Sequence, residues 1–159
     1  MKHTLSVLVE NKPGVLARIA GLFSRRGFNI DSLAVGITED PDVSRMTITV
    51  DAAEHPIEQV TKQLHKLINV IKITDLDPER TVARELSLVK VSTDAKTRGE
   101  VMQIAEIFRA RILDVGKKSL TIEVTGTTGK IEALEQLLQP HGVVEIVRTG
   151  RVAIERGGK

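Results

Sequence analysis

The sequence predicts an α+β protein made of two ferredoxin-like domains, each with the element order βαββαβ. In the first half, segments with alternating apolar residues and segments with apolar residues at helical spacing follow one another in that order. The second half repeats the pattern, which indicates an internal duplication. Aromatic residues make up only 2% of the 159 residues, so the core relies on aliphatic side chains, which favours thin layers of sheet and helix.

The first half supplies these elements in order. Leu5, Val7 and Val9 alternate with their neighbours, as expected for a strand. Residues 15–25 then carry apolar side chains at helical spacing, which predicts an amphipathic helix. The remaining expected elements are a strand at 29–38, a turn at 39–42, a strand at 44–51, a helix at 57–68 and a strand at 70–73. This order predicts an antiparallel sheet with both helices on one face.

The second half matches the first segment by segment. Residues 46–50, MTITV, correspond to residues 120–124, LTIEV, 74 positions later. The expected elements of this half are strands at 84–93, 111–117, 118–126 and 142–149, and helices at 98–110 and 130–139. We therefore predict a first domain at 1–76, a linker at 77–83 and a second domain at 84–159.

The composition excludes several classes of protein. Cysteine is absent, which rules out disulfides, thiolate nucleophiles and Cys-based metal sites. The net charge is only +2, and the basic residues are scattered among acids, which argues against a nucleic-acid partner. No apolar run approaches the length needed to cross a bilayer, and the first residues resemble neither a signal nor a transit segment. We therefore expect no membrane partner and a cytoplasmic location.

The sequence contains no pattern typical of catalysis or metal binding. Its four histidines show no ligand spacing, and no acidic cluster completes a metal site. Its serines lack the context of a nucleophile elbow. We expect neither a catalytic residue nor a metal ligand in this chain.

The segment at residues 11–16, NKPGVL, lies between the first expected strand and the first expected helix. Gly14 has no Cβ, so a ligand can approach the backbone N–H groups at the helix start. The helix dipole favours an anion such as a carboxylate there. The carboxamides of Asn11 and Asn29 both donate and accept hydrogen bonds, which suits a zwitterion. We therefore hypothesise that the first domain senses a free amino acid.

Each of these residues also has a simpler structural interpretation. Taken alone, Gly14 is more often a turn residue at a helix start, and Asn29 could satisfy local backbone groups. The side chains of Val15 and Leu16 would fill the core or an interface while their amides remain available. The flanking asparagines favour ligand binding over the purely structural interpretation.

Two neighbouring motifs carry a resemblance to a known family. Residues 11–16, NKPGVL, followed by residues 27–30, GFNI, resemble the effector-binding loop of ACT domains. From Leu5 to about Glu155, the chain is similar to the small, regulatory subunits of acetolactate synthase, also called acetohydroxyacid synthase. Further similar segments are 22–27, LFSRRG; 44–47, SRMT; 63–67, QLHKL; and 106–109, EIFR.

The resemblance implies a subunit that has no chemistry and binds no cofactor of its own. Its partner would be a large catalytic subunit that uses thiamine diphosphate, magnesium and FAD to condense pyruvate with a second 2-oxo acid. The small subunit would raise the activity of this partner. It would also confer feedback inhibition by a branched-chain amino acid, usually valine, in isoleucine, valine and leucine biosynthesis. Two copies would form a homodimer through ACT domains that pair side by side, with effector sites at the interface.

The resemblance also implies six effector-binding residues: Asn11, Gly14, Val15, Leu16, Asn29 and Ile30. The side chain of Asn11 would orient the effector, and the backbone N–H groups of residues 14–16 would bind its carboxylate. Asn29 and Ile30 would contact the effector from the partner protomer. The second domain has residues 93–99, TDAKTRG, in place of the Pro-Gly turn. We therefore expect effector sites only in the first domain, while the second would support association with the catalytic subunit.

An ACT-domain regulator of another amino-acid pathway stays open as the main alternative. RNA-binding modules share this topology, but they stack bases on aromatic residues of central strands, and residues 46–50 contain none. A small ferredoxin-like hydrolase would need a general base beside Arg18 and Asn11, and none accompanies them. The sequence does not rank valine, leucine and isoleucine, because a methylene is worth only about 1–3 kcal/mol in a pocket.

Overall fold

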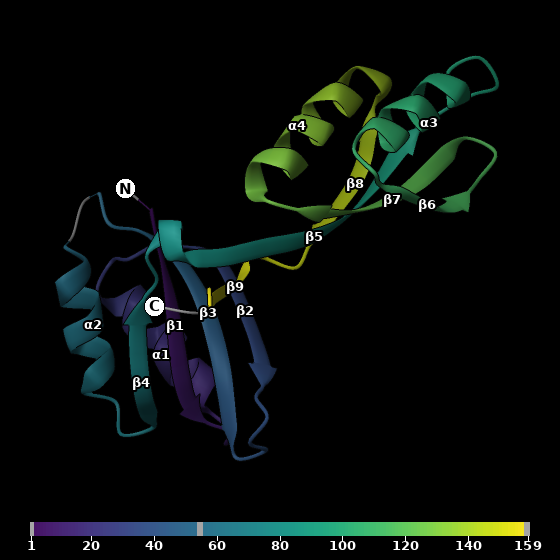
Figure 1. Cartoon of the computed structure of the whole chain (residues 1–159). Helices are drawn as coiled ribbons and strands as arrows, with labels where there is room; N and C mark the ends of the chain where they lie inside the picture. The colour runs from purple at the N-terminus through teal and green to yellow at the C-terminus, as the bar shows by residue number, and fades with distance from the viewer. Residues whose placement is uncertain (1, 54–55, 158–159) are drawn as a thin grey trace. The chain divides into compact units, whose positions relative to one another are not determined.

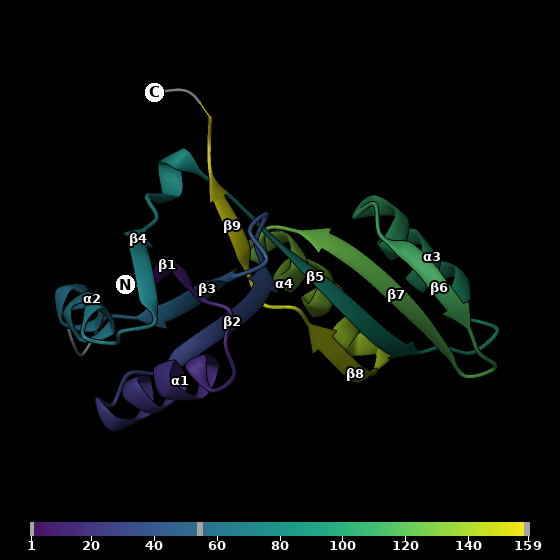
Figure 2. The same cartoon turned by 90° about the horizontal axis from the view of Figure 1, so that it is seen from below.

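The computed structural model describes residues 2–53 and 56–157 of the chain. The chain divides into two compact units, Met1–Val82 together with Arg151–Lys159, and Ala83–Gly150. Each unit holds an antiparallel sheet and two α-helices (Figures 1 and 2). The predicted α+β class with two ferredoxin-like domains is therefore confirmed.

The first unit folds in the expected order. Its elements are β1 (Lys2–Glu10), α1 (Val15–Arg25), β2 (Ile30–Ile37), β3 (Val43–Asp51), α2 (Ile57–His65) and β4 (Val70–Asp75). The strand order in the sheet is β2-β3-β1-β4, and every neighbouring pair is antiparallel. Val7 and Ile48 from the sheet share one buried core with Ile19 of α1 and with Val60 and Leu64 of α2. Both helices therefore cover the same face of this sheet (Figure 1).

The end of α1 is a Schellman motif, which sets where β2 begins. Gly27 has a φ of 75°, a left-handed conformation that favours glycine. The backbone N–H of Phe28 donates to the carbonyl of Phe23 at 3.0 Å, and that of Gly27 donates to Ser24 at 3.3 Å. The rings of Phe23 and Phe28 then pack edge to face, 6.1 Å apart. This hydrophobic contact ends the helix and directs the chain into β2.

The second unit repeats the architecture. The short helix η1 (Pro78–Arg80) still belongs to the first unit, and β5 (Thr81–Ser92) runs from there into the second unit. The other elements of the second unit are α3 (Arg98–Ile107), β6 (Arg111–Val115), β7 (Ser119–Gly126), α4 (Thr128–Leu138), η2 (Gln139–His141) and β8 (Val143–Arg148). The strand order along the main path of the sheet is β6-β7-β5-β8, the counterpart of the first sheet. Val89 and Ile122 from the strands pack with Val101 of α3 and Leu134 of α4 in a separate core.

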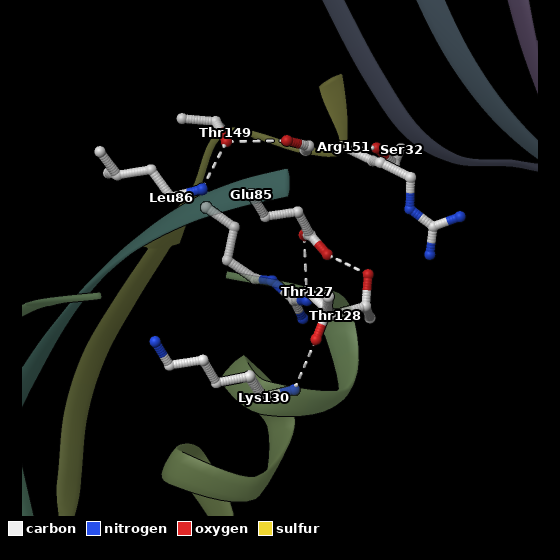
Figure 3. Close-up of polar contacts among 10 residues, drawn as sticks. Ser32, Glu85, Leu86, Thr127, Thr128, Lys130, Thr149 and Arg151 are labelled. Atoms are coloured by element: carbon white, nitrogen blue, oxygen red, sulfur yellow. Dashed lines mark hydrogen bonds and ion pairs between the residues drawn. The ribbon is translucent and has the colours of Figure 1, made fainter. Parts of the chain in front are cut away.

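A buried carboxylate ties three elements of the second unit together (Figure 3). Glu85 of β5 accepts a hydrogen bond from Thr128 at the start of α4 and another from Arg148 of β8, the latter at 3.1 Å. Thr127 caps α4 by accepting a hydrogen bond from the backbone N–H of Lys130. A buried carboxylate is tolerated where it is paired and hydrogen-bonded, as Glu85 is here.

A ninth strand, β9 (Val152–Glu155), is not among the elements that the sequence predicts. It pairs with β5. The backbone N–H of Arg151 donates to Ser32 of β2 at 2.7 Å, and its guanidinium donates to Thr4 of β1 at 3.0 Å. Residues 151–157 thus group with the first unit, whereas the expected second domain ran from 84 to 159, of which 158–159 lie outside the described residues. A strand of four residues carries no periodicity that tells which sheet it joins.

Candidate functional site

The loop between β1 and α1 has the backbone conformation that its glycine predicts. Gly14 immediately precedes α1 and has φ 86° and ψ −11°, in the left-handed region. A Cβ placed on Gly14 would meet no atom of the described residues within 4 Å. The glycine is therefore needed for the backbone conformation, and the space beside the loop is open.

The start of α1 leaves hydrogen-bond donors open. Among the residues that the structure describes, no side chain caps this helix, and no acidic residue lies in its first turn. The amide of Val15 makes a long contact of 3.4 Å with the carbonyl of Lys12, and in the described part of the chain the amides of Leu16 and Ala17 meet no acceptor. Open amides at the positive end of a helix dipole form a site for an anion.

Asn11 is held by the turn that connects β2 and β3. Its backbone N–H donates to the carbonyl of Asp42 at 2.8 Å, and its side-chain amide donates to the carbonyl of Pro41 at 2.9 Å. Among the described residues, no donor reaches its side-chain oxygen. The carboxamide is thus oriented by the turn and keeps an acceptor for an ammonium group.

Asn29 and Ile30 lie at the other end of α1. The side-chain amide of the exposed Asn29 donates to Asp31 at 3.1 Å, and Ile30 packs against the core. Ile30 pairs with Val50, near the end of β3, whereas Asn11 follows Glu10 beside the start of β3. The 11 residues of α1 span about 16 Å. A single chain therefore does not bring the two groups of predicted residues together.

Four residues outside the predicted set brace the loop: Glu10, Lys12, Arg18 and Asn69. The carboxamide of Asn69 donates to Glu10 at 3.1 Å and accepts from Arg18 at 2.7 Å. Glu10 also forms an ion pair with Lys12 at 2.7 Å. The hydrogen bond from Lys12 and then that from Asn69 lower the pKa of Glu10, and Glu10 raises the pKa of Lys12. Glu10 and Lys12 are near neighbours in sequence, but no local pattern points to Asn69.

The corresponding loop of the second unit carries its own anion. The carboxylate of Asp94 accepts the backbone N–H groups of Lys96 at 2.8 Å and Thr97 at 2.9 Å. These hydrogen bonds, that of Thr97 first, lower the pKa of Asp94. Thr97, the residue before α3, has a φ of −96° and so lacks the left-handed turn of Gly14.

Over 2–53 and 56–157, no group of three or more His, Asp or Glu side chains could hold a metal ion. No helix in the same ranges is long and apolar enough to cross a membrane.

Two family models match the chain, one in each half. Residues 5–72 match the family of ACT domains that resemble the small subunit of acetohydroxyacid synthase (AHAS). Residues 84–157 match the family of acetolactate synthase small subunits. The acetolactate synthase small subunit of Mycolicibacterium smegmatis is 59% identical over 98% of this chain and 91% of its own length. The chain belongs to the acetolactate synthase small subunit family.

Other relatives of this family extend the match over the whole chain. A probable acetolactate synthase small subunit from Archaeoglobus fulgidus is 55% identical over 100% of this chain and 99% of its own length. The crystal structure of the acetolactate synthase small subunit from Thermotoga maritima superposes with a TM-score of 0.92 at 46% identity, covering 100% of this chain and 99% of that one. The resemblance seen in the sequence is confirmed. The family places the chain in branched-chain amino acid biosynthesis, and its ACT domain is consistent with a regulatory role.

Proposed function

We propose that this chain binds a branched-chain amino acid, usually valine, and thereby inhibits the large catalytic subunit of acetolactate synthase, which it otherwise activates. The open start of α1 beside Gly14 carries this proposal, because its free amides suit the carboxylate of an amino acid. The oriented carboxamide of Asn11 is available for the ammonium group. The large subunit would supply thiamine diphosphate, magnesium and FAD, and the assembly would be cytoplasmic.

A homodimer would complete the site, and the edge position of β2 supports this proposal. β2 is an edge strand, and the side chains of Val35 and Ile37 on it are 47% and 66% exposed. Antiparallel pairing of β2 with a second copy of itself would place Ile30 of one chain beside Ile37 of the other. Within each chain Ile37 pairs with Ser44, and the adjoining β2–β3 turn holds Asn11. Each loop would then receive Asn29 and Ile30 from the second copy.

The dimer interface gives inhibition a physical route. An effector that bridges two ACT domains binds one arrangement of the dimer better than another, and it shifts the population by that difference in affinity. Useful coupling between sites is about 1–3 kcal/mol, or roughly 5–150-fold in affinity. The second unit, whose helix start already holds a carboxylate, would serve association with the large subunit.

The match of both halves to acetolactate synthase small subunits disfavours the alternative, a regulator of a different amino-acid pathway. Reconstitution with the large subunit of the same organism tests the proposal. Adding this chain should raise the rate of acetolactate formation, and titrating valine, leucine and isoleucine separately should then lower it. Activation without inhibition by any of the three would refute the effector assignment. Failure to activate or to be pulled down by the large subunit would refute the partner.

A further inference from the structure

We propose that the carboxamide of Asn69 is a positioning group that sets the geometry of the effector loop and so tunes the affinity for the amino acid. This inference rests on the proposed function, because it concerns the same loop at residues 11–14. Asn69 itself is not one of the loop residues. It lies after α2, just before β4, and only 9% of its surface is exposed.

Asn69 holds both ends of the loop at once. Its side-chain N–H donates to Oε1 of Glu10, the last residue of β1, at 3.1 Å. Its side-chain oxygen accepts from Nη1 of Arg18, in the first turns of α1, at 2.7 Å. Its backbone carbonyl accepts the N–H of Glu10 at 2.9 Å. The residue that precedes the loop and the helix that follows it are therefore fixed to one small buried side chain.

The chemistry of this clamp requires a carboxamide. The donor of Asn69 faces a carboxylate and its acceptor faces a guanidinium, so both hydrogen bonds are charge-assisted and stronger than neutral ones. Alanine offers neither group, and a carboxylate at this position would face Glu10 without a donor. Without this carboxamide, the long side chain of Arg18 would lose the hydrogen bond to Asn69 that restrains it.

The open amides of Leu16 and Ala17 point along the axis of α1 toward its N-terminus. The clamp fixes the direction of this axis relative to the end of β1. Binding sites lose affinity when their groups are not held in the productive geometry, even if every contact group is still present. The clamp also holds Glu10 where it pairs with Lys12 at 2.7 Å, which keeps the ammonium of Lys12 beside β1. All of these contacts lie in the first unit, so the clamp acts on effector binding rather than on activation.

Calorimetry with valine on the full chain tests the inference, with three variants. Asn69→Ala removes both side-chain hydrogen bonds. Arg18→Met removes only the hydrogen bond to the side-chain oxygen of Asn69, and it does so at an exposed residue. Ser6→Ala is the matched control, because it removes a part-buried hydrogen bond of 2.8 Å that the buried Ser6 accepts from another arginine, Arg45, in the same unit. All measurements are made well below the unfolding temperature of the least stable variant.

We expect Asn69→Ala to raise the Kd for valine at least threefold, Arg18→Met to raise it less, and Ser6→Ala to leave it unchanged. The double variant Asn69→Ala/Arg18→Met should cost no more affinity than Asn69→Ala alone, because the two residues act through one contact. Activation of the large subunit should be the same for all. A purely structural role of Asn69 predicts lower unfolding temperatures for Asn69→Ala and Ser6→Ala alike, with an unchanged Kd for both.

Two results would overturn the inference, and they differ from each other. If wild-type protein binds valine and Asn69→Ala or, should that variant not fold, Arg18→Met binds it equally well, the clamp has no positioning role while the proposed function stands. If wild-type protein gives no binding heat with valine, leucine or isoleucine, the effector site itself is wrong and the clamp falls with it.

Discussion

In the first unit, α1 begins after Gly14, with no acidic residue in its first turn and no side-chain cap from the described part of the chain. In the second unit, α3 begins after Thr97, and the carboxylate of Asp94 accepts the amides just before the helix. The first turn of α3 also contains Glu100. The two domains share their element order and strand order, so the duplicated fold itself requires neither arrangement.

This difference locates the proposed ligand site in a few loop residues and not in the fold. A fixed carboxylate beside a helix start fulfils the electrostatic role that a free anion would otherwise take. Asp94 and Glu100 would repel the carboxylate of an amino acid, whereas the open turn at Gly14 would attract it. One scaffold can therefore bind a metabolite in one copy and serve association in the other.

A carboxylate introduced at the open helix start should have the largest effect. Gly14→Asp adds a negative charge where the effector carboxylate would bind, at a φ of 86° that side chains rarely adopt. We expect valine inhibition to be lost altogether, which corresponds to a coupling of roughly 5–150-fold, while activation of the large subunit is retained. Steady-state rates of the reconstituted enzyme with and without valine measure both quantities.

Gly99→Asp is the matched control for this variant. Gly99 lies in the first turn of α3, and a Cβ placed there would meet no atom of residues 2–53 and 56–157 within 4 Å. An acidic residue in a first turn suits the helix dipole, so this variant should fold normally and keep full valine inhibition. Equal inhibition of both variants would remove the distinction between the two helix starts.

Asn29→His should have the next largest effect, because it alters the contact proposed to come from the second copy. Losing a hydrogen bond to a charged ligand should raise the valine concentration for half-inhibition by about tenfold or more. Asp31→Ala removes the same Asn29–Asp31 hydrogen bond and leaves the carboxamide of Asn29 in place. The enzyme reconstituted with this variant should therefore be inhibited normally by valine. A loss of inhibition in Asp31→Ala alone would mean that Asn29 only orients Asp31.

Apolar spacing in the sequence was enough to predict most of the fold. The predicted helix at 15–25 is α1, and the predicted strand at 44–51 lies within β3. The strand β5 begins at Thr81, whereas it was expected to begin at residue 84. The junction sequence lacks alternation, so it does not indicate where the strand begins. The short β9 escapes prediction for a related reason, since its four residues pair with β5, a strand that lies far earlier in the chain.

The candidate site also contains residues that the sequence predicts and contacts that only the folded structure reveals. Gly14 and Asn11 can be found in the sequence because a glycine between a strand and a helix marks a special turn. The clamp at Asn69 cannot, since it joins residues about fifty or more positions apart that form contacts only after the sheet has formed. Asp94 was part of the segment that replaces the Pro-Gly turn, but its hydrogen bonds to the backbone follow from the folded loop.

The smallest expected effect is a pH dependence that belongs to the second helix start. Backbone hydrogen bonds from Thr97 and Lys96 lower the pKa of Asp94 below its ordinary value of 3.8, so its charged form stabilises the folded state. That stability is present above about pH 4 and is lost as the pH falls through the lower pKa of the folded protein.

Asp94→Asn should therefore unfold roughly a few degrees below wild type at pH 7, and this gap in unfolding temperature should close toward pH 3. A gap for Asp94→Asn that persists at pH 3 would show that the charge of Asp94 is not what holds this loop, and the electrostatic contrast between the two units would fail.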